Sequence, residues 1–154
     1  MARLTESETL LGTKILTWIG IINQLAEARS TRALAALKLP FPQFVLLNHF
    51  SHRPDEAKTV TGVAAAMQQP QPGVTKTIQK LIARKYLRAA AAPNDRRSKL
   101  LYLTPKGLEA YGRAIAALVP VFRDLFAPWN ETEMKDLIAK LDLLKAWLDT
   151  KGRE

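Results

Sequence analysis

The chain has 154 residues, of which 47% are hydrophobic and 24% are charged, and it contains no cysteine. This composition is typical of a globular protein, and it excludes disulfides, thiolate zinc sites and redox sensing through cysteine. The 23 basic and 14 acidic residues give a net charge of +9. A chain of this length is expected to form one domain, or one domain with an extension.

The N-terminal region has no pattern typical of a secretory signal. Its apolar segment, residues 10–22, is interrupted by Gly12 and Lys14 and is too short to span a bilayer. We therefore expect a soluble, cytoplasmic protein that has no membrane partner.

The first predicted helix follows Thr5, which has the spacing of a capping box with Glu8. Apolar residues then recur at alternating steps of four and three, which is the pattern of a narrow coiled-coil seam. The residues of this N-terminal row are Leu11, Ile15, Trp18, Ile22 and Leu25. Such a row packs either against its own domain or against a second copy of the chain.

Pro40 and Pro42 interrupt the helical pattern, and Pro42 is suited to the first position of a second helix that ends at Pro54. The predicted buried stripe of this helix is Phe44, Leu47 and Phe50.

Residues 59–63 predict a short extended segment that leads into a small helix capped by Thr61. Residues 68–73 contain two prolines and a glycine, which predict a turn, and Pro72 is suited to the first turn of the next helix. That helix buries Val74, Ile78, Leu81 and Ile82 at helical period. Two short helices joined by a tight turn form a helix-turn-helix unit.

Residues 87–91 and 99–103 predict two strands of a β-hairpin, joined by a basic turn from Asn94 to Lys99. Four consecutive alanines weaken the first strand, but Pro93 closes the segment too soon for a helix. Residues 76–106 hold nine basic residues and one acid, so this fifth of the chain carries +8 of the net +9. Such a concentrated field suits a polyanion, above all nucleic acid. The alternative is a solvated charged turn with no partner.

A long helix is predicted from Pro105, with a kink near residues 116–120 because Pro120 lies inside it. Its predicted apolar row is Leu108, Tyr111, Ile115, Leu118, Phe122 and Leu125. A last helix is capped by Asn130, to which Glu133 reaches back. Its row is Met134, Leu137, Leu141, Leu144 and Leu148.

Both ends of the chain carry more apolar surface than a single domain of this size needs. We therefore expect a homodimer in which the terminal helices interlock. The residues predicted to mediate it are Leu11, Ile15, Trp18, Ile22, Leu137, Leu141, Leu144 and Leu148. The alternative is packing of the two termini against each other within one chain.

This order of elements resembles the MarR family of winged helix-turn-helix transcriptional regulators. Residues 39–47, LPFPQFVLL, are similar to the family's Leu-Thr-x-x-Gln-x-x-x-Leu opening. Residues 95–107, DRRSKLLYLTPKG, are similar to its Asp-x-Arg-x-x-x-x-x-Leu-Thr-x-x-Gly wing signature. The chain departs from the family in the Pro/Gln-rich run before Gly73, and in Tyr86, which stands where glycine usually joins the helix to the hairpin.

The resemblance implies a mainly α fold with a small β-hairpin wing, in which a winged helix-turn-helix domain is flanked by dimerisation helices. Residues 1–38 would be the N-terminal dimerisation helix, residues 39–104 the DNA-binding domain and residues 105–154 the C-terminal dimerisation helices, all in one continuous structural unit.

The predicted DNA-binding residues lie on the second helix of the helix-turn-helix and in the basic turn. Because each helical residue advances by 100°, Thr75, Lys76 and Gln79 are placed to reach base edges or phosphates, and Lys80 and Arg84 to reach phosphates. Arg96, Arg97 and Lys99 are placed to enter a minor groove or contact the backbone. By resemblance, Arg97 reads the groove and Asp95 orients its guanidinium through a bidentate pair.

The expected function is sequence-specific regulation of transcription through a palindromic double-stranded operator, as a repressor. The resemblance also implies a small aromatic or phenolic effector in a cleft bordered by Trp18, Phe44, Asn48 and Tyr111, although core packing explains the same four residues. Two alternatives are a nonspecific architectural DNA-binding protein and a winged-helix module that binds an acidic protein. Salt titration of the DNA affinity separates them.

No nucleophile and base, phosphate loop or framed carboxylate pair stands out, so we expect neither an enzyme nor a cofactor. His49 and His52 lie three apart, a spacing that can hold a metal. With no third ligand evident nearby, we expect no metal site and interpret them as surface or capping residues.

Overall fold

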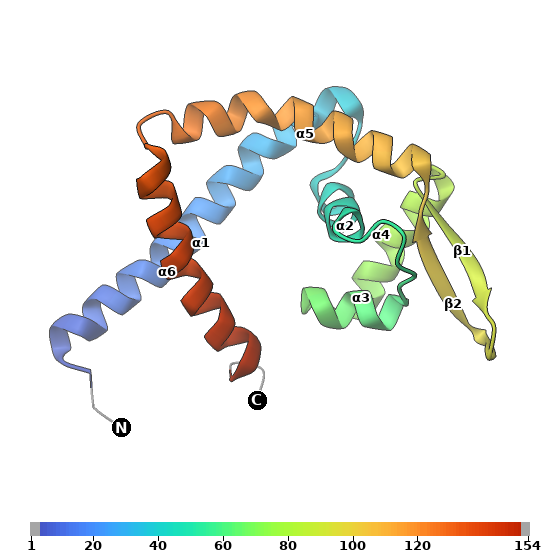
Figure 1. The fold of residues 1–154 in the computed structure, drawn as a ribbon, viewed down its shortest axis with the longest axis horizontal. Coiled ribbons are helices and arrows are strands. Elements are labelled where there is room, and N and C mark those ends of the chain that lie inside the picture. Colours follow the sequence, from blue (N-terminus) through green and yellow to red (C-terminus); the bar gives the residue numbers. More distant parts are fainter. Residues whose placement is uncertain (1–3, 152–154) are drawn as a thin grey trace. The chain divides into compact units, whose positions relative to one another are not determined.

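The computed structural model describes residues 4–151, in which the chain folds mainly into helices with one antiparallel β-hairpin (Figure 1). Packing divides the chain into two compact units, residues 1–119 and residues 120–154. The functional division predicted at residues 38/39 and 104/105 stays a prediction, and its outermost residues, 1–3 and 152–154, lie outside the described part of the chain. None of the helices formed by the described residues is long and apolar enough to cross a membrane.

The first unit begins with a long helix, α1 (Glu6–Leu34). Its start confirms the predicted capping box, because Thr5 Oγ1 accepts the backbone N–H of Glu8 at 3.2 Å and Glu8 Oε2 accepts the N–H of Thr5 at 2.7 Å. These hydrogen bonds lower the pKa of the Glu8 carboxyl. The helix reaches the core only near its end, where Ser30 and Leu34 are buried.

A short 3₁₀ helix, η1 (Ala35–Leu37), leads from α1 to α2 (Phe41–Ser51). Between them Lys38 adopts a left-handed conformation with φ of 51°. The helix α2 begins one residue before the predicted start at Pro42, because Pro40 occupies the N-cap. It buries Gln43, Leu46, Leu47 and Phe50. The predicted Phe44 is only partly buried and packs at the edge of the core.

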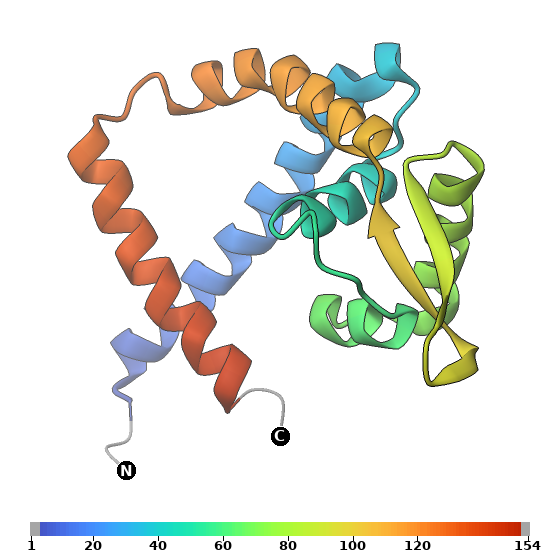
Figure 2. The ribbon, with the colours of Figure 1, turned by 45° about the vertical axis from the view of Figure 1, so that its right-hand side comes forward.

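Two short helices, α3 (Val60–Met67) and α4 (Gln71–Ala83), form the predicted helix-turn-helix (Figure 2). The predicted cap of the first helix was wrong: Thr61 lies inside α3. Thr59 is the cap, because its extended backbone lets Oγ1 accept the N–H of Gly62 at 3.0 Å. The core unites the end of α1, the helices α2, α3 and α4, the hairpin and residues 110–118 of the following helix. Its largest fully buried side chains are Phe50, Leu34, Leu46, Leu47, Leu81, Leu87, Leu101, Leu118, Val63 and Val74.

The hairpin consists of β1 (Leu87–Ala92) and β2 (Asp95–Leu103), with Leu87 opposite Leu103. The prediction of an alanine-rich first strand is confirmed. The second strand begins at Asp95, four residues before its predicted start at residue 99. The turn is therefore shorter than predicted, and most of the basic residues lie on β2. Lys58 adds one bridge to this strand: its N–H donates to the Leu101 carbonyl at 3.0 Å and its carbonyl accepts from Leu101 at 2.7 Å.

The junction between α4 and β1 is closed by the start of α5 (Pro105–Phe126). Thr104 Oγ1 donates to the Lys85 carbonyl at 2.6 Å and accepts the N–H of Gly107 at 2.9 Å. A Cβ at Gly107 would collide with the carbonyl oxygen of Tyr86. The Thr-x-x-Gly part of the wing signature therefore lets α5 pack directly against this junction.

The buried side of α5 differs from the predicted row of large residues. Leu118 is buried as predicted, and Tyr111 and Ile115 are partly buried, but Leu108, Phe122 and Leu125 are exposed. Small residues line the rest of the buried face: Gly107, Ala110 and Ala114. Because small side chains allow close packing, α5 uses them for its own core and leaves larger ones outside.

The second unit, residues 120–154, contains the end of α5 and the helix α6 (Glu131–Thr150). Pro120 does not end α5, and the kink predicted near it stays a prediction. The predicted cap of α6 is confirmed: Asn130 Oδ1 accepts the N–H of Glu133 at 3.0 Å, and Glu133 Oε2 accepts the N–H of Asn130 at 3.0 Å. No residue of α6 is buried among those the structure describes.

Candidate nucleic-acid interface

The helix α4 turns an apolar side to the core and a basic, polar side outward. Val74, Ile78 and Leu81 are buried, whereas the predicted contact residues Lys76, Gln79 and Lys80 are exposed. Thr75 is partly buried, and its hydroxyl donates to the Gln71 carbonyl at 2.8 Å. The side chains of Lys76, Gln79 and Lys80 thus have no role in the core and face solvent together.

The N-terminus of α4 has no acidic residue and no side-chain cap, since Pro70 occupies the N-cap and Pro72 the second helical position. Its partial positive charge is therefore left without a compensating carboxylate. Such a helix start favours an anion from outside the chain.

Arg84 differs from the other predicted DNA contacts, because its guanidinium is engaged within the protein. Nη1 donates to the Lys38 carbonyl at 2.7 Å and to Gln43 Oε1 at 3.0 Å. Nη2 donates to the Tyr86 hydroxyl at 3.1 Å, and the guanidinium lies 4.6 Å from the centroid of the Tyr86 ring. This geometry argues against the predicted phosphate contact. Arg84 instead ties the end of α4 to the junction of η1 and α2.

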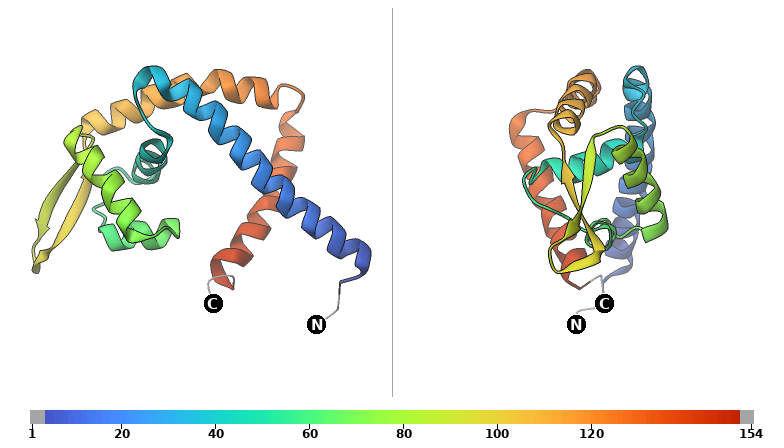
Figure 3. Two further views of the ribbon diagram at one scale, coloured as in Figure 1. Left: turned by 180° about the vertical axis from the view of Figure 1, so that it is seen from behind. Right: turned by 90° about the vertical axis from the view of Figure 1, so that its right-hand side faces the viewer.

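The tip of the hairpin presents its arginines on a bulge. Ala91 pairs with Lys99 and Ala92 with Asp95, which leaves residues 96–98 without partners on β1. Arg96, Arg97 and Lys99 are all exposed. A bulge redirects the side chains of a strand, so these cations project from the tip rather than along a flat sheet. Within the first unit, the hairpin extends beyond the short helices, with α4 beside it (Figure 3).

Asp95 does not make the predicted bidentate pair with the Arg97 guanidinium. Its Oδ1 accepts the backbone N–H of Arg97 at 2.9 Å, and no ion pair of Asp95 occurs within residues 4–151. At the bulge, the backbone N–H of Arg97 lies within hydrogen-bond distance of the Asp95 carboxylate. The carboxylate therefore orders the tip through the main chain and leaves the guanidinium of Arg97 free.

The basic residues of segment 76–106 remain uncompensated. The ion pairs of the described chain join Arg53 to Glu56, Arg113 to Glu109, Lys135 to Glu131 and Lys145 to Asp149. None of them involves a residue of this segment. The field of this segment is thus available to an external partner.

Three exposed cations of the segment were absent from the predicted contacts: Lys85, Arg88 and Lys106. The Arg88 guanidinium lies 4.2 Å from the centroid of the Tyr102 ring on the opposite strand, and Lys106 Nζ lies 5.7 Å from that of Tyr86. Their charge was visible in the sequence, but the contact of Arg88 with Tyr102 depends on the hairpin register, and that of Lys106 with Tyr86 on the packing of α5.

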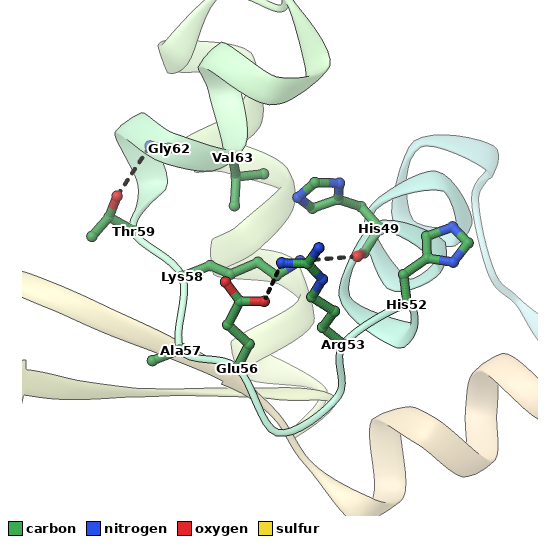
Figure 4. Close-up of a pocket in the computed structure, with 9 residues that line it drawn as sticks. All are labelled: His49, His52, Arg53, Glu56, Ala57, Lys58, Thr59, Gly62 and Val63. Carbon is green, nitrogen blue, oxygen red and sulfur yellow. Dashed lines mark hydrogen bonds and ion pairs between the residues drawn. The ribbon is translucent and has the colours of Figure 1, made fainter. Parts of the chain in front are cut away.

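A pocket of about 540 Å³ lies where α2 ends and α3 begins (Figure 4). His49 and His52 line it together with Glu56. Lys58 Nζ donates to the His49 carbonyl at 3.1 Å, and burial, followed by the charge of Lys58, lowers the pKa of His49. Within residues 4–151 there is no group of three His, Cys, Asp or Glu side chains that could hold a metal ion.

The structure brings together three of the four residues predicted to border an effector cleft. The Tyr111 hydroxyl donates to Asn48 Oδ1 at 2.8 Å, and the Tyr111 ring stacks on Phe44 with centroids 6.1 Å apart. The three side chains thus contact one another, through one hydrogen bond and one ring stack. Trp18 lies on α1 and is 51% exposed.

The residues predicted to mediate dimerisation are exposed on both units, except for Leu144, which is partly buried. In the first unit, the whole N-terminal row of α1 faces solvent, with Leu11 at 59% exposure. In the second, Leu137, Leu141 and Leu148 are exposed, as is Trp147 beside them. Each unit thus carries an apolar surface that its own fold does not cover.

A model of the MarR family matches residues 37–98, which run from η1 to the bulge of the hairpin. The resemblance to the MarR family is confirmed. No curated protein sequence matches the chain.

Solved structures of MarR-type proteins share the fold. A MarR protein from Peptoclostridium difficile superposes with a TM-score of 0.78 at 21% identity, covering 98% of this chain and 95% of that one. The transcriptional regulator BldR from Sulfolobus solfataricus gives 0.77 at 19% identity, with 93% and 99% covered. A mutant MarR from Escherichia coli complexed with operator DNA gives 0.73 at 18% identity, with 93% and 99% covered. The chain is thus a mainly helical winged helix-turn-helix with a two-stranded wing.

Proposed function

We propose that this chain is a transcriptional regulator that binds specific double-stranded DNA as a homodimer. The observation that carries the proposal is the uncompensated cationic surface on α4 and the wing, where none of the nine basic residues of segment 76–106 forms an ion pair within the described chain. The matching fold of a MarR protein complexed with operator DNA supports it.

Each part of the interface has a role in this proposal. Gln79 on α4 faces base edges in a major groove, and Lys76 and Lys80 neutralise phosphates. Arg97 on the bulge of the wing enters the minor groove, where the narrow A·T geometry favours arginine. Arg96 and Lys99 contact the neighbouring backbone.

The proposal includes a homodimer because specific recognition of a palindrome needs two copies of α4 related by a two-fold axis. The exposed apolar rows of α1 and α6 support it, since exposed patches of this kind mark interaction surfaces. Repression by occlusion of a promoter, and release by a small aromatic effector, complete the proposal. For the effector, Phe44, Asn48 and Tyr111 would have to exchange their contacts with one another for contacts with the ligand.

The experiment compares the affinities for a duplex selected from a random pool and for a duplex of scrambled sequence, by fluorescence anisotropy at several salt concentrations. A specific regulator keeps a ratio of roughly 10³ or more between the two. A ratio near one would indicate an architectural DNA-binding protein, and no measurable binding to either duplex would indicate a protein partner.

Arg97→Ala tests the wing in the same assay. We expect weaker binding, by roughly 1–3 kcal/mol, with an unchanged dimer mass, because a groove contact is lost. Lys135→Ala is the matched control, since it removes one exposed cation from α6. Equal affinities of the Arg97→Ala variant and the wild type would contradict the role of the wing.

A further inference from the structure

Gly73 is an exposed residue in the first turn of α4 for which the described chain supplies no reason. Glycine destabilises a helix relative to alanine, and two structural reasons for its presence are a backbone conformation and a close contact that exclude other residues. The first reason is absent, because no described glycine has a positive φ. The second is absent within the protein, because a Cβ at Gly73 would meet no atom within 4 Å.

Other glycines of this unit show what an intramolecular reason looks like. A Cβ at Gly107 would collide with the Tyr86 carbonyl, and one at Gly62 would lie 3.0 Å from Thr59 Oγ1. Gly73 has neither constraint, although it follows Pro72, because proline restricts the residue before it rather than the one after it. Gly12, Gly20 and Gly112 are equally unconstrained, but of these four described glycines only Gly73 lies on α4. A close contact at Gly73 would therefore come from a partner of α4 outside the chain.

The surroundings of Gly73 indicate the chemistry of that contact. Steps of 100° place Lys76 and Lys80 on the same side of α4, three and seven residues further on. Both lysines are exposed, and neither ammonium group forms a hydrogen bond or ion pair in the part of the chain that the structure describes. The helix contains no acidic residue. This side of α4 thus suits a repeating anion.

We propose that Gly73 is the point at which the sugar–phosphate backbone of duplex DNA approaches α4 most closely. The missing Cβ lets the DNA backbone lie against the first turn of the helix, while Lys76 and Lys80 neutralise the flanking phosphates. The inference rests on the proposed function and adds a determinant of affinity that carries no charge and makes no hydrogen bond through a side chain.

The test is Gly73→Ala, whose effects on stability and on DNA binding have opposite signs. A methyl group there finds free space in the protein, so the melting temperature rises, by roughly 2–4 °C. The same methyl group keeps the DNA backbone away, so the affinity falls on the order of tenfold. Because the contact is to the backbone, a selected duplex and a random-sequence duplex lose affinity equally. Gly112→Ala is the control, since Gly112 is an exposed helical glycine of α5 that also has no neighbour within 4 Å.

Circular dichroism measures the melting temperatures, sedimentation confirms an unchanged mass, and anisotropy with the two duplexes measures the affinities. Gly112→Ala is expected to raise the melting temperature and leave the affinities unchanged. Unchanged or tighter binding by Gly73→Ala would overturn the inference while leaving the proposed function intact. A loss confined to the selected duplex would overturn the backbone contact in favour of a base contact. If the wild-type protein bound neither duplex, the inference and the proposed function would both fail.

Discussion

Lys85 shows how a single position at the end of α4 sets the path into the wing. Its φ of 61° lies in the left-handed region, and the N–H of Tyr86 donates to the Leu81 carbonyl at 2.9 Å, which is the pattern of a Schellman motif. Glycine is the usual residue at this position. The left-handed residue is thus Lys85, one position before Tyr86, where the resemblance to the MarR family places the glycine.

Lys85→Gly is therefore expected to stabilise the protein, by about 0.5–1 kcal/mol, because glycine adopts a left-handed conformation without strain. Lys85→Ala is the control, since it removes the same charge and keeps the Cβ. Urea unfolding of the three proteins measures the difference, and an alanine variant as stable as the glycine variant would show that charge, not strain, dominates.

Asp95 lowers the positive charge of the hairpin tip, yet its carboxylate holds the backbone N–H of Arg97. Asp95→Asn keeps an oxygen acceptor and removes the charge, whereas Asp95→Ala removes both. We expect Asp95→Asn to bind duplex DNA more tightly than Asp95→Ala, roughly fivefold, because one net hydrogen bond orders the tip. Anisotropy with a selected duplex measures both, and equal affinities would show that the hydrogen bond is irrelevant to binding.

The helix α4 is fixed at its end by Arg84, and two of its acceptors, the Lys38 carbonyl and Gln43 Oε1, lie more than 40 residues earlier in the chain. No local pattern in the sequence could have shown this, because Lys38 and Gln43 are brought near only by the fold. For α5, the periodicity predicted the helix but placed large residues on its buried side. The buried side instead carries Ala110 and Ala114, because the close approach at Gly107 brings α5 too near the core for larger side chains. Caps and turns with local signatures, such as Asn130 with Glu133, were predictable.

Arg84→Met should destabilise the protein, by about 1.5–3 kcal/mol, because the Lys38 carbonyl and Gln43 lose a charged donor. Lys80→Met removes the same charge from the same helix but breaks no described contact. It should change stability by less than about 0.5 kcal/mol, yet lower the salt dependence of DNA binding by about one counterion. Urea unfolding and salt titration separate the two roles. A loss of salt dependence in Arg84→Met without destabilisation would restore Arg84 as a phosphate contact.

The two units carry exposed apolar rows that a second copy of the chain can cover. On α6, Leu141 is 41% exposed and Leu148 is 48% exposed. Leu141→Glu combined with Leu144→Glu should give monomers or insoluble protein, because charges buried without partners oppose association. Sedimentation velocity measures the mass, and a stable dimer in the double variant would contradict the role of α6 in the interface.

The fold of the winged helix could be predicted from its turn residues and its wing signature, because both are local. The side of the molecule that we propose binds DNA was indicated by charge alone, since +8 of the net charge lies in one segment. The individual contacts could not, because Arg84, Asp95 and Arg97 take their roles from tertiary contacts and from a bulge.

Selection of bound duplexes from a random-sequence pool tests the central claim most directly. A homodimer that places α4 in a major groove on each half-site is expected to enrich an inverted repeat, with half-site centres about 10 base pairs apart or a multiple of that spacing. A pool that shows no enriched sequence after repeated selection would contradict the assignment of this chain as a sequence-specific regulator.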